Sequence, residues 1–390
     1  MMPRSSQAGE RPLHILCYLH AVELGGVERT ALRLCRAWGA SARVTVALGR
    51  DDGWRGGAGD LDMVIAPRPA VSPRLWETLW MLAWLPRVIL RERPDVLFCA
   101  GNTYSIIAVV LKLLLGRRCP PVVSKISNSL ARSDLPAPVR RLHDLWSRMQ
   151  GRAIDGFVGM TPAMTREAQR ALGVSSGRVA TIPSPLFDAA ALDRLAGPRS
   201  VRTKGGRMLV AIGRLEPQKN LPLLLRAFAR GRRRDDRLVI VGAGRERNRL
   251  AALIETLGLS GRAMLAGHAE DVSGWLLRAD ALLLSSDYEG VPAVVLEAMA
   301  AGLPVVATDC CASMAGMLAE RRGVLVSPRD VDALADAIAH LTPDTCDPVA
   351  QLAFAREHAV DAAASAYLPI FRRAARERAR AIPCQEHAYS

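Results

Sequence analysis

Aromatic residues make up only 5% of this 390-residue sequence. Proteins that bind single-stranded nucleic acid interleave aromatic side chains with basic ones for base stacking, so this class is disfavoured. The eight cysteines form no Cys-x-x-Cys pair, and no cluster of cysteine and histidine has the spacing of metal ligands. Cys17 and Cys99 lie in apolar, strand-like runs. They are interpreted as buried free thiols in a reducing compartment.

Long hydrophobic runs are also missing. Residues 1–11 are polar, and the apolar run Leu13–Leu19 is too short and too interrupted for the core of a signal peptide. Ile106–Leu115 contains Lys112 and has about half of the ~20 residues that a membrane helix needs. We therefore expect a cytoplasmic protein that does not span the membrane. Peripheral binding to the inner membrane stays open.

Basic residues outnumber acidic ones, 52 to 38, which gives a net charge of +14. This balance favours anionic partners such as phosphorylated substrates, nucleic acid or an acidic membrane surface. A generally arginine-rich composition explains it equally well. With few aromatic residues available for stacking, we expect no nucleic-acid partner.

The hydrophobic pattern alternates between strand-like and helix-like segments, which predicts doubly wound parallel sheets. The chain is long for one domain, and two are expected. In the first half, the predicted strands are 13–19, 43–48, 95–100, 122–126 and 156–160. After a polar break that ends near residue 206, the pattern restarts and runs to about residue 345. Arg356–Arg380 is predicted to be a long helix interrupted at Pro369.

Two carboxylates stand eight residues apart after the predicted strand Ala281–Leu284. Glu289 lies on the loop and Glu297 in the predicted helix Ala293–Ala301, which Gly302 ends. Loops at this edge of a parallel sheet bind ligands. Because carboxylates accept hydrogen bonds and sugars present donors, the pair suggests a hydroxyl-rich ligand.

Arg214 and Lys219 lie in the turn after the strand Met208–Ile212. The planar arginine fork and the movable lysine charge can hold the two halves of a diphosphate. The alternative interpretation is a solvated turn with two surface cations.

Glycines follow several strands. Gly25-Gly26 precedes a predicted helix, whose N-terminal amides favour phosphate. Gly242 and Gly244 end another strand, and Gly267-His268 a third. Tight turns explain these glycines as well as ligand contact does, and His268 can contribute through backbone atoms alone.

Trp76, Trp80 and Trp84 recur every four residues on one predicted helix. One interpretation is a helix packed on the sheet. The other is an interfacial surface lying among lipid headgroups. The arginines that would assist it are Arg74, Arg87, Arg91 and Arg93.

In their order along the chain these segments resemble the retaining glycosyltransferases of family 4. The most specific is Glu289-Gly-Val-Pro292 with Glu297-Ala-Met-Ala-Ala-Gly-Leu-Pro behind it, followed by the Arg214/Lys219 turn. The resemblance implies the GT-B fold: two Rossmann-like domains facing a cleft, with a C-terminal helix crossing back. The expected boundaries are 1–195 for the acceptor side, 196–355 for donor binding, and 356–390 for the return helix and tail.

The resemblance further implies transfer of a sugar, typically a hexose, with retention from a nucleotide-diphosphate sugar, UDP or GDP. The acceptor would be a hydroxyl of a glycan or lipid-linked glycan in exopolysaccharide, lipopolysaccharide or glycolipid synthesis. Arg214 and Lys219 would hold the diphosphate, Glu289 the sugar hydroxyls and Glu297 the ribose. No metal or further cofactor is expected. The remaining donor-binding candidates are Gly25, Gly26, Gly213, Gly242, Gly244, Gly267, His268, Gly290, Val291 and Pro292.

The chain departs from the family pattern on the acceptor side, where many members carry a histidine near residues 122–126. Lys125, Ser127 and Asn128 are the substitute candidates here. Ile182-Pro-Ser-Pro185 and Asp309-Cys-Cys311 also differ from the usual sequence. Two alternatives therefore remain: a non-catalytic partner that binds a sugar nucleotide or a membrane, and a sugar-nucleotide epimerase or hydrolase that needs no acceptor.

Overall fold

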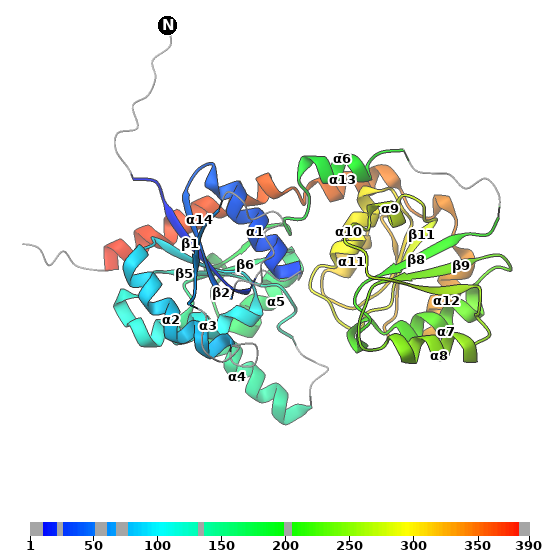
Figure 1. The fold of residues 1–390 in the computed structure, drawn as a ribbon, viewed down its shortest axis with the longest axis horizontal. Coiled ribbons are helices and arrows are strands. Elements are labelled where there is room, and N and C mark those ends of the chain that lie inside the picture. Colours follow the sequence, from blue (N-terminus) through cyan, green and yellow to red (C-terminus); the bar gives the residue numbers. More distant parts are fainter. Residues whose placement is uncertain are drawn as a thin grey trace, which may run out of the picture. The chain divides into compact units, whose positions relative to one another are not determined.

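The computed structural model describes residues 11–21, 26–50, 61–67, 77–131, 136–198 and 205–381. The chain forms two compact units, each built on its own sheet (Figure 1). Unit 1 contains residues 1–160, 168–185 and 360–390, and unit 2 contains residues 161–167 and 186–359.

Unit 1 has a seven-stranded sheet in the order β3-β2-β1-β4-β5-β6-β7, and all of its strand pairs are parallel. The strands are β1 (His14–Ala21), β2 (Arg43–Arg50), β3 (Asp62–Ile65), β4 (Val96–Cys99), β5 (Val122–Lys125), β6 (Gly156–Gly159) and β7 (Val179–Thr181). The sequence pattern missed the edge strands β3 and β7. Both are short and only partly buried, so they carry no continuous apolar run.

The helices of the first βα series are α1 (Gly26–Gly39), α2 (Glu77–Glu92), α3 (Ser105–Leu115), α4 (Ala137–Ala153) and α5 (Pro162–Leu172), and α14 (Val360–Ala381) completes unit 1. The prediction that the C-terminal helix breaks at Pro369 is wrong, because α14 is continuous through it. Pro369 and Ser365, four residues earlier, are both exposed, so water can hydrate the carbonyl group that loses its partner. The helix also begins later than expected, since residues 357–359 separate it from α13 (Pro348–Arg356).

An aromatic cluster fixes α14 to the core of unit 1. The Trp38 ring of α1 meets Phe98 and Phe371 edge to face, with centroids 5.0 Å apart in both cases. Tyr367 joins the cluster, and Trp38 Nε1 donates to the carbonyl oxygen of Ala364 over 3.0 Å. The expected return of the last helix to the first unit is therefore confirmed.

Unit 2 has a six-stranded parallel sheet in the order β10-β9-β8-β11-β12-β13. Its strands are β8 (Met208–Ile212), β9 (Arg237–Val241), β10 (Ala263–Gly267), β11 (Ala281–Leu284), β12 (Val305–Thr308) and β13 (Val324–Val326). The further helices are α6 (Ala189–Leu195), α7 (Leu221–Gly231), α8 (Arg247–Thr256), α9 (Ser273–Leu276), α10 (Ala293–Ala300), α11 (Met314–Leu318) and α12 (Val331–His340). α6 packs against α9 and α10. In both units the strand order reverses beside the first strand, the arrangement of a Rossmann-like fold.

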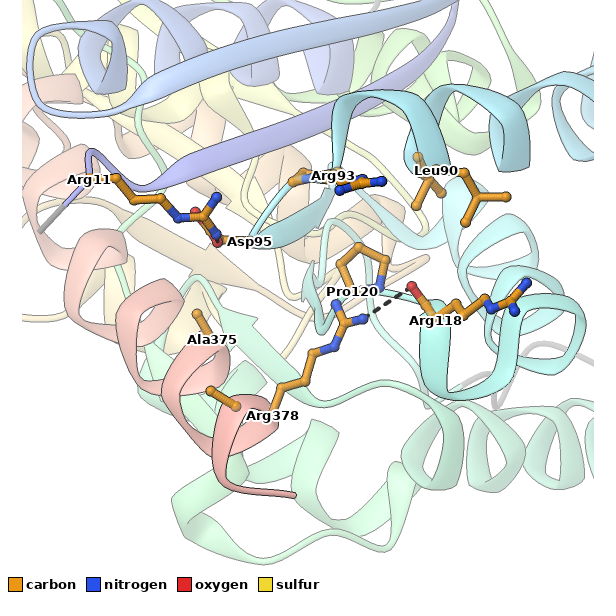
Figure 2. Close-up of a pocket in the computed structure, with 11 residues that line it drawn as sticks. Arg11, Leu90, Arg93, Asp95, Arg118, Pro120, Ala375 and Arg378 are labelled. Carbon is orange, nitrogen blue, oxygen red and sulfur yellow. Dashed lines mark hydrogen bonds and ion pairs between the residues drawn. The ribbon is translucent and has the colours of Figure 1, made fainter. Parts of the chain in front are cut away.

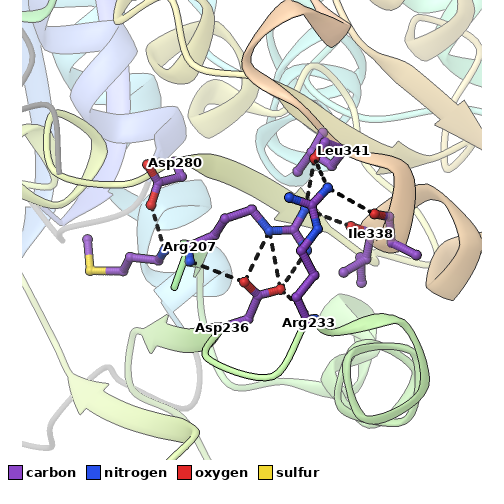
Figure 3. Close-up of polar contacts among 8 residues, drawn as sticks. Arg207, Arg233, Asp236, Asp280, Ile338 and Leu341 are labelled. Atoms are coloured by element: carbon purple, nitrogen blue, oxygen red, sulfur yellow. Dashed lines mark hydrogen bonds and ion pairs between the residues drawn. The ribbon is translucent and has the colours of Figure 1, made fainter. Parts of the chain in front are cut away.

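A buried ion pair joins the start of the unit 2 sheet to α12 (Figure 3). Arg207 Nη2 lies 2.5 Å from Oδ2 of Asp236, whose side chain is 1% exposed. The other arm of the guanidinium donates to the carbonyl oxygens of Ile338 and Leu341 over 2.9 and 2.8 Å. Arg233 adds a backbone hydrogen bond to Asp236. These contacts hold the amino-terminal edge of the sheet, away from the loops that carry the candidate site.

Candidate functional site

The carboxyl ends of β8 and β11, neighbours in the unit 2 sheet, bring the predicted basic turn and the predicted acidic loop together. Lys219 Nζ donates to Glu289 Oε1 over 2.6 Å. The two side chains are only 16% and 11% exposed. Ser286 Oγ donates to the same carboxylate oxygen over 2.8 Å. Lys219, Ser286 and Gly213 line one small cavity at this edge.

Because Gly213 has no side chain, the side chain of Lys219 can lie directly against it. A Cβ at position 213 would lie 2.9 Å from Cε of Lys219, closer than real Cβ atoms approach other atoms. The glycine predicted from its place after β8 therefore leaves room for the Lys219 side chain in its observed position.

Further hydrogen bonds join the turn after β8 to the loop after β11. Gln218 Nε2 donates to the carbonyl oxygen of Tyr288 over 2.8 Å, and the Asp287 amide donates to the carbonyl oxygen of Gln218 over 2.8 Å. Asn220, in the left-handed conformation at φ 44°, donates from Nδ2 to Asp287 Oδ1. The sequence analysis assigned no function to these residues. Arg214 is exposed, and its Nη2 makes one long contact of 3.4 Å to Gln218 Oε1.

Gly242 and Gly244 are required by backbone packing. A Cβ on Gly242 would lie 1.9 Å from the carbonyl oxygen of Gly213, and one on Gly244 would lie 2.4 Å from that of Leu215. These two glycines let the turn after β9 press against the turn that carries Arg214.

Gly267 differs from them. It has a φ of 86°, and a Cβ added there would have no atom within 4 Å. Its carbonyl oxygen accepts from the Gly242 amide over 2.7 Å. The His268 side chain beside it is exposed.

The other donor-side candidates lie around the start of α10. Pro292 is buried as the residue before the helix, Val291 is half-buried, and Glu297 is half-buried within α10. Gly290 is buried, and its carbonyl oxygen accepts a hydrogen bond from Cys311 Sγ over 3.0 Å.

Two adjacent cysteines contact the loop that carries Glu289. The Glu289 amide donates to the carbonyl oxygen of Cys310 over 3.2 Å. The interaction between the thiols of Cys310 and Cys311, followed by burial, raises the pKa of Cys310, while the hydrogen bond from Cys310 lowers the pKa of Cys311. The sequence marked these cysteines as a departure from the family pattern but gave no sign of this contact, because the carboxyl ends of β11 and β12 meet only in the fold.

Unit 1 carries its own polar cluster. Lys125, the last residue of β5, is 3% exposed, and burial lowers its pKa to about 8, against the opposing effect of Glu28. Glu28 in turn accepts a hydrogen bond from the Tyr104 hydroxyl over 2.7 Å. Tyr104 was not among the predicted site residues. The only signal available was its position just after a buried strand.

Ser127 and Asn128 are bound to the loop after β4. The Ser127 amide donates to Asn102 Oδ1 over 2.8 Å, and Asn102 Nδ2 donates to the carbonyl oxygen of Asn128 over 3.2 Å. A Cβ on Gly101 would lie 2.8 Å from Ser127 Oγ and 3.0 Å from Cγ1 of Val27. The acceptor-side candidates therefore lie beside the start of α1, where a Cβ on Gly26 would meet no atom within 4 Å.

Gly25, Arg74 and Trp76 lie outside the described residues. Trp80 and Trp84 are half-buried on α2, while Arg87, Arg91 and Arg93 are exposed. No helix within the described ranges is long and apolar enough to cross a membrane. Among the same residues, no group of three or more His, Cys, Asp or Glu side chains is placed to hold a metal ion.

Comparison with known families covers both units. Residues 24–186 match the model described as Glycosyltransferase Family 4, and residues 206–344 match the model described as Glycosyl transferases group 1. The chain belongs to the glycosyltransferases. This glycosyltransferase is 36% identical over 196 residues to the exopolysaccharide phosphotransferase SCO2592 of Streptomyces coelicolor, a match that covers 49% of the chain and 20% of the relative.

It is also 29% identical over 209 residues to LpsE, a lipopolysaccharide core biosynthesis glycosyltransferase of Rhizobium meliloti, covering 54% of the chain and 52% of LpsE. These matches thus span about a fifth and about half of the two relatives. Among solved structures, Anabaena Alr3699/HepE in complex with UDP superposes with a TM-score of 0.72 at 16% identity, over 93% of this chain and all of that one. The likeness of fold confirms the predicted GT-B class of two Rossmann-like domains.

Proposed function

We propose that this glycosyltransferase moves a sugar, with retention of anomeric configuration, from a nucleotide-diphosphate sugar to a hydroxyl of a glycan or lipid-linked glycan. The observation that carries the proposal is the Lys219–Glu289 pair with Arg214 on the same turn, at the carboxyl edge of the unit 2 sheet. In this proposal unit 2 binds the donor and unit 1 contributes the acceptor side.

The cations of the turn are assigned to the diphosphate. Arg214 is exposed and can swing towards a phosphate, while Lys219 is held in place by Glu289. A bound diphosphate would compete for the Lys219 ammonium and would release the Glu289 carboxylate towards the hydroxyls of the donor sugar. Both cations would then stabilise the negative charge that develops on the leaving diphosphate. This chemistry needs no metal ion, so turnover is expected to continue in excess EDTA.

UDP is the first donor base to test, since the structural neighbour HepE was solved with UDP. Thermal-shift measurements with UDP-, GDP- and ADP-sugars would identify the base. A ligand at 100 times its Kd adds about 2.7 kcal/mol of stability. Gly267 and Glu297 are the proposed neighbours of the nucleoside.

The acceptor is proposed to be a growing surface polysaccharide or a lipid-linked glycan, because the relatives above are named for exopolysaccharide and lipopolysaccharide synthesis. Lys125, Ser127 and Asn128 are the proposed acceptor-side residues. Purified protein with a donor panel and lipid-linked acceptors should release nucleoside diphosphate, and proton NMR of the product should give the anomeric configuration.

Glu289→Ala is the decisive variant. It should abolish transfer, whereas Glu255→Ala, which removes an exposed carboxylate from α8, should not. If product yield with Glu289→Ala equals that of the wild type, the proposed catalytic site is wrong. Consumption of nucleotide sugar without acceptor, at the rate of transfer, would favour an epimerase or hydrolase instead.

We further propose that the protein works at the cytoplasmic surface of the inner membrane. Leu113 on α3 and Leu142 and Leu145 on α4 are 73%, 67% and 53% exposed, and α3 packs against α4. Exposed leucines next to arginines suit an interfacial surface. The double variant Leu142→Glu/Leu145→Glu should lose binding to anionic vesicles in flotation assays. Val349→Glu, at a 77% exposed position in unit 2, should keep it.

A further inference from the structure

A second cavity lies in unit 1 at the amino-terminal edge of its sheet (Figure 2). Its volume is about 570 Å³. It is lined by residues that precede β1, β4 and β5 and by the last turns of α2 and α14: Arg11, Ile89, Leu90, Arg93, Pro94, Asp95, Arg118, Pro120, Ala375, Arg378 and Ala379. The cavity lies at the sheet edge opposite to Lys125 and the start of α1, so it is separate from the acceptor-side candidates.

Four arginines and one carboxylate surround this cavity. Asp95 is already engaged, since Oδ1 accepts from Arg11 Nη2 over 2.5 Å and Oδ2 accepts from the His14 amide over 2.8 Å. No carboxylate of a described residue lies within ion-pair distance of Arg93, Arg118 or Arg378. Glu377 lines the adjoining cavity, whose other acidic residue, Asp155, pairs with Lys112 over 2.6 Å. Among the described residues that line the cavity, arginines therefore outnumber carboxylates four to one.

The Arg378 guanidinium is oriented by backbone contacts. Its Nη2 donates to the carbonyl oxygens of Arg117 and Arg118 over 3.2 and 3.1 Å. These bonds hold the half-buried side chain across the cavity and leave its remaining N–H donors for another acceptor. The Arg118 side chain itself extends away from Arg378 (Figure 2).

Arg93 has an unfavourable backbone conformation. It closes α2 with φ 47°, its amide donates to the Ile89 carbonyl oxygen over 3.0 Å, and Pro94 follows. Glycine is strongly preferred at this position after a helix, because a side chain is strained there. The helix end alone would thus favour glycine, and a cationic side chain held under strain beside a cavity indicates a use for its charge.

We propose that this cavity binds the phosphate group of an anionic ligand, with Arg93 and Arg378 as the principal contacts. Planar guanidinium groups bind phosphate oxygens through paired hydrogen bonds. The apolar walls formed by Leu90 and Pro120 also suit the glycerol or acyl portion of a lipid, so the phosphate comes either from a free anion or from a lipid headgroup. The site is distinct from the donor and acceptor sites of the proposed transfer reaction.

The test uses the full-length Lys219→Ala protein, in which the donor site is disabled, and isothermal titration with inorganic pyrophosphate at constant ionic strength. Arg93→Gly should raise the melting temperature by relieving strain and weaken pyrophosphate binding at least tenfold. Arg321→Gly is the matched control, because Arg321 also has a left-handed conformation, at φ 59°, in unit 2. Arg321→Gly also removes the hydrogen bond from Arg321 Nη2 to the carbonyl oxygen of Asp344, and it should leave pyrophosphate binding unchanged. Arg93→Asn, which tolerates the same backbone conformation, replaces Arg93→Gly if that variant fails to fold.

A second titration with dihexanoylphosphatidylglycerol below its micelle concentration separates the two sources. Tighter binding of the lipid than of pyrophosphate, lost in Arg93→Gly, identifies a headgroup site. Tighter binding of pyrophosphate, lost in the same variant, identifies a free phosphate site. The proposal is overturned if Arg93→Gly binds both probes as well as Arg321→Gly does, or if the Lys219→Ala protein binds neither.

Discussion

Lys219 Nζ and Glu289 Oε1 lie 2.6 Å apart, although 70 residues separate them in the sequence. The pair links the turn after β8 to the loop after β11. Because both side chains are largely removed from water, loss of one partner leaves the other as a poorly hydrated charge. The same contact therefore supports the local structure and sets the proposed donor site.

The first prediction is a measurable coupling between these two residues. Lys219→Met and Glu289→Gln should each destabilise the fold, and the double variant should be more stable than the sum of the two losses predicts, by roughly 0.5–3 kcal/mol. Urea unfolding of the four proteins measures this coupling. Strictly additive losses would show that the ion pair does not form in solution.

The second prediction distinguishes structural glycines from accessible ones. Gly242→Ala should destabilise unit 2 by roughly 2 kcal/mol or more, since its methyl group would collide with the Gly213 carbonyl oxygen. Gly26→Ala should leave the melting temperature nearly unchanged, because a Cβ there meets no atom within 4 Å. Calorimetry measures both effects. Equal destabilisation by the two substitutions would contradict the packing described above.

The third prediction concerns acid stability. Burial by itself raises the pKa of Asp236, but the hydrogen bonds from Arg207 and Arg233 outweigh it, so the pKa is lowered on folding. A lowered carboxyl pKa stabilises the fold at pH values above the unfolded-state pKa of about 3.9, and the contribution is lost as the pH falls through the folded-state pKa.

Asp236→Ala should accordingly cost roughly 3–5 kcal/mol at pH 7. The control, Asp332→Ala, removes an 84% exposed partner of Arg230 and should cost less than about 1 kcal/mol. Unfolding by urea at pH 7 and pH 3 provides the comparison. A similar loss of stability in both variants at pH 7 would show that Arg207 and Asp236 do not form the ion pair described above.

The fourth prediction concerns the alkaline range, where the buried amine of Lys125 destabilises the fold as long as it is protonated. Lys125 has a folded-state pKa of about 8, lowered by burial, against about 10.4 in an unfolded chain. Between these values the unfolded state binds more protons, so stability should rise with pH, by on the order of 3 kcal/mol in total. Below pH 8 the free-energy cost of burying the protonated Lys125 side chain is fully present.

Lys125→Met should therefore be more stable than the wild type at pH 7. Its free energy of unfolding should also rise less between pH 8 and 10 than that of the wild type. Urea unfolding at pH 7, 8, 9 and 10 measures the difference between the two proteins. If the rise is the same in both, its origin lies in other groups.

The sequence predicted the features that depend on local pattern. Long apolar runs marked the buried strands, and the order of motifs led to the family and to the GT-B fold. Glu289 and Lys219 were both proposed from their positions after strands. Their contact could not be derived, because it depends on β8 and β11 becoming neighbours in the sheet.

Features that depend on tertiary packing were missed. Pro369 was predicted to interrupt a helix that the aromatic contacts of Tyr367 and Phe371 keep continuous. The strain at Arg93 is a backbone property that residue type does not reveal. Likewise, the contact between Cys311 and Gly290 joins two loops that are distant in the sequence.

The attachment of α14 to Trp38 has a consequence for synthesis on the ribosome. Unit 1 emerges first, yet Tyr367 and Phe371, which complete its aromatic core, are made only after all of unit 2. Unit 2 is encoded almost without interruption and can fold as soon as it emerges. During synthesis, Trp38 and Phe98 therefore stay exposed until α14 has been made. A chain truncated before residue 371 would contain all of unit 2 but would lack part of the aromatic core of unit 1.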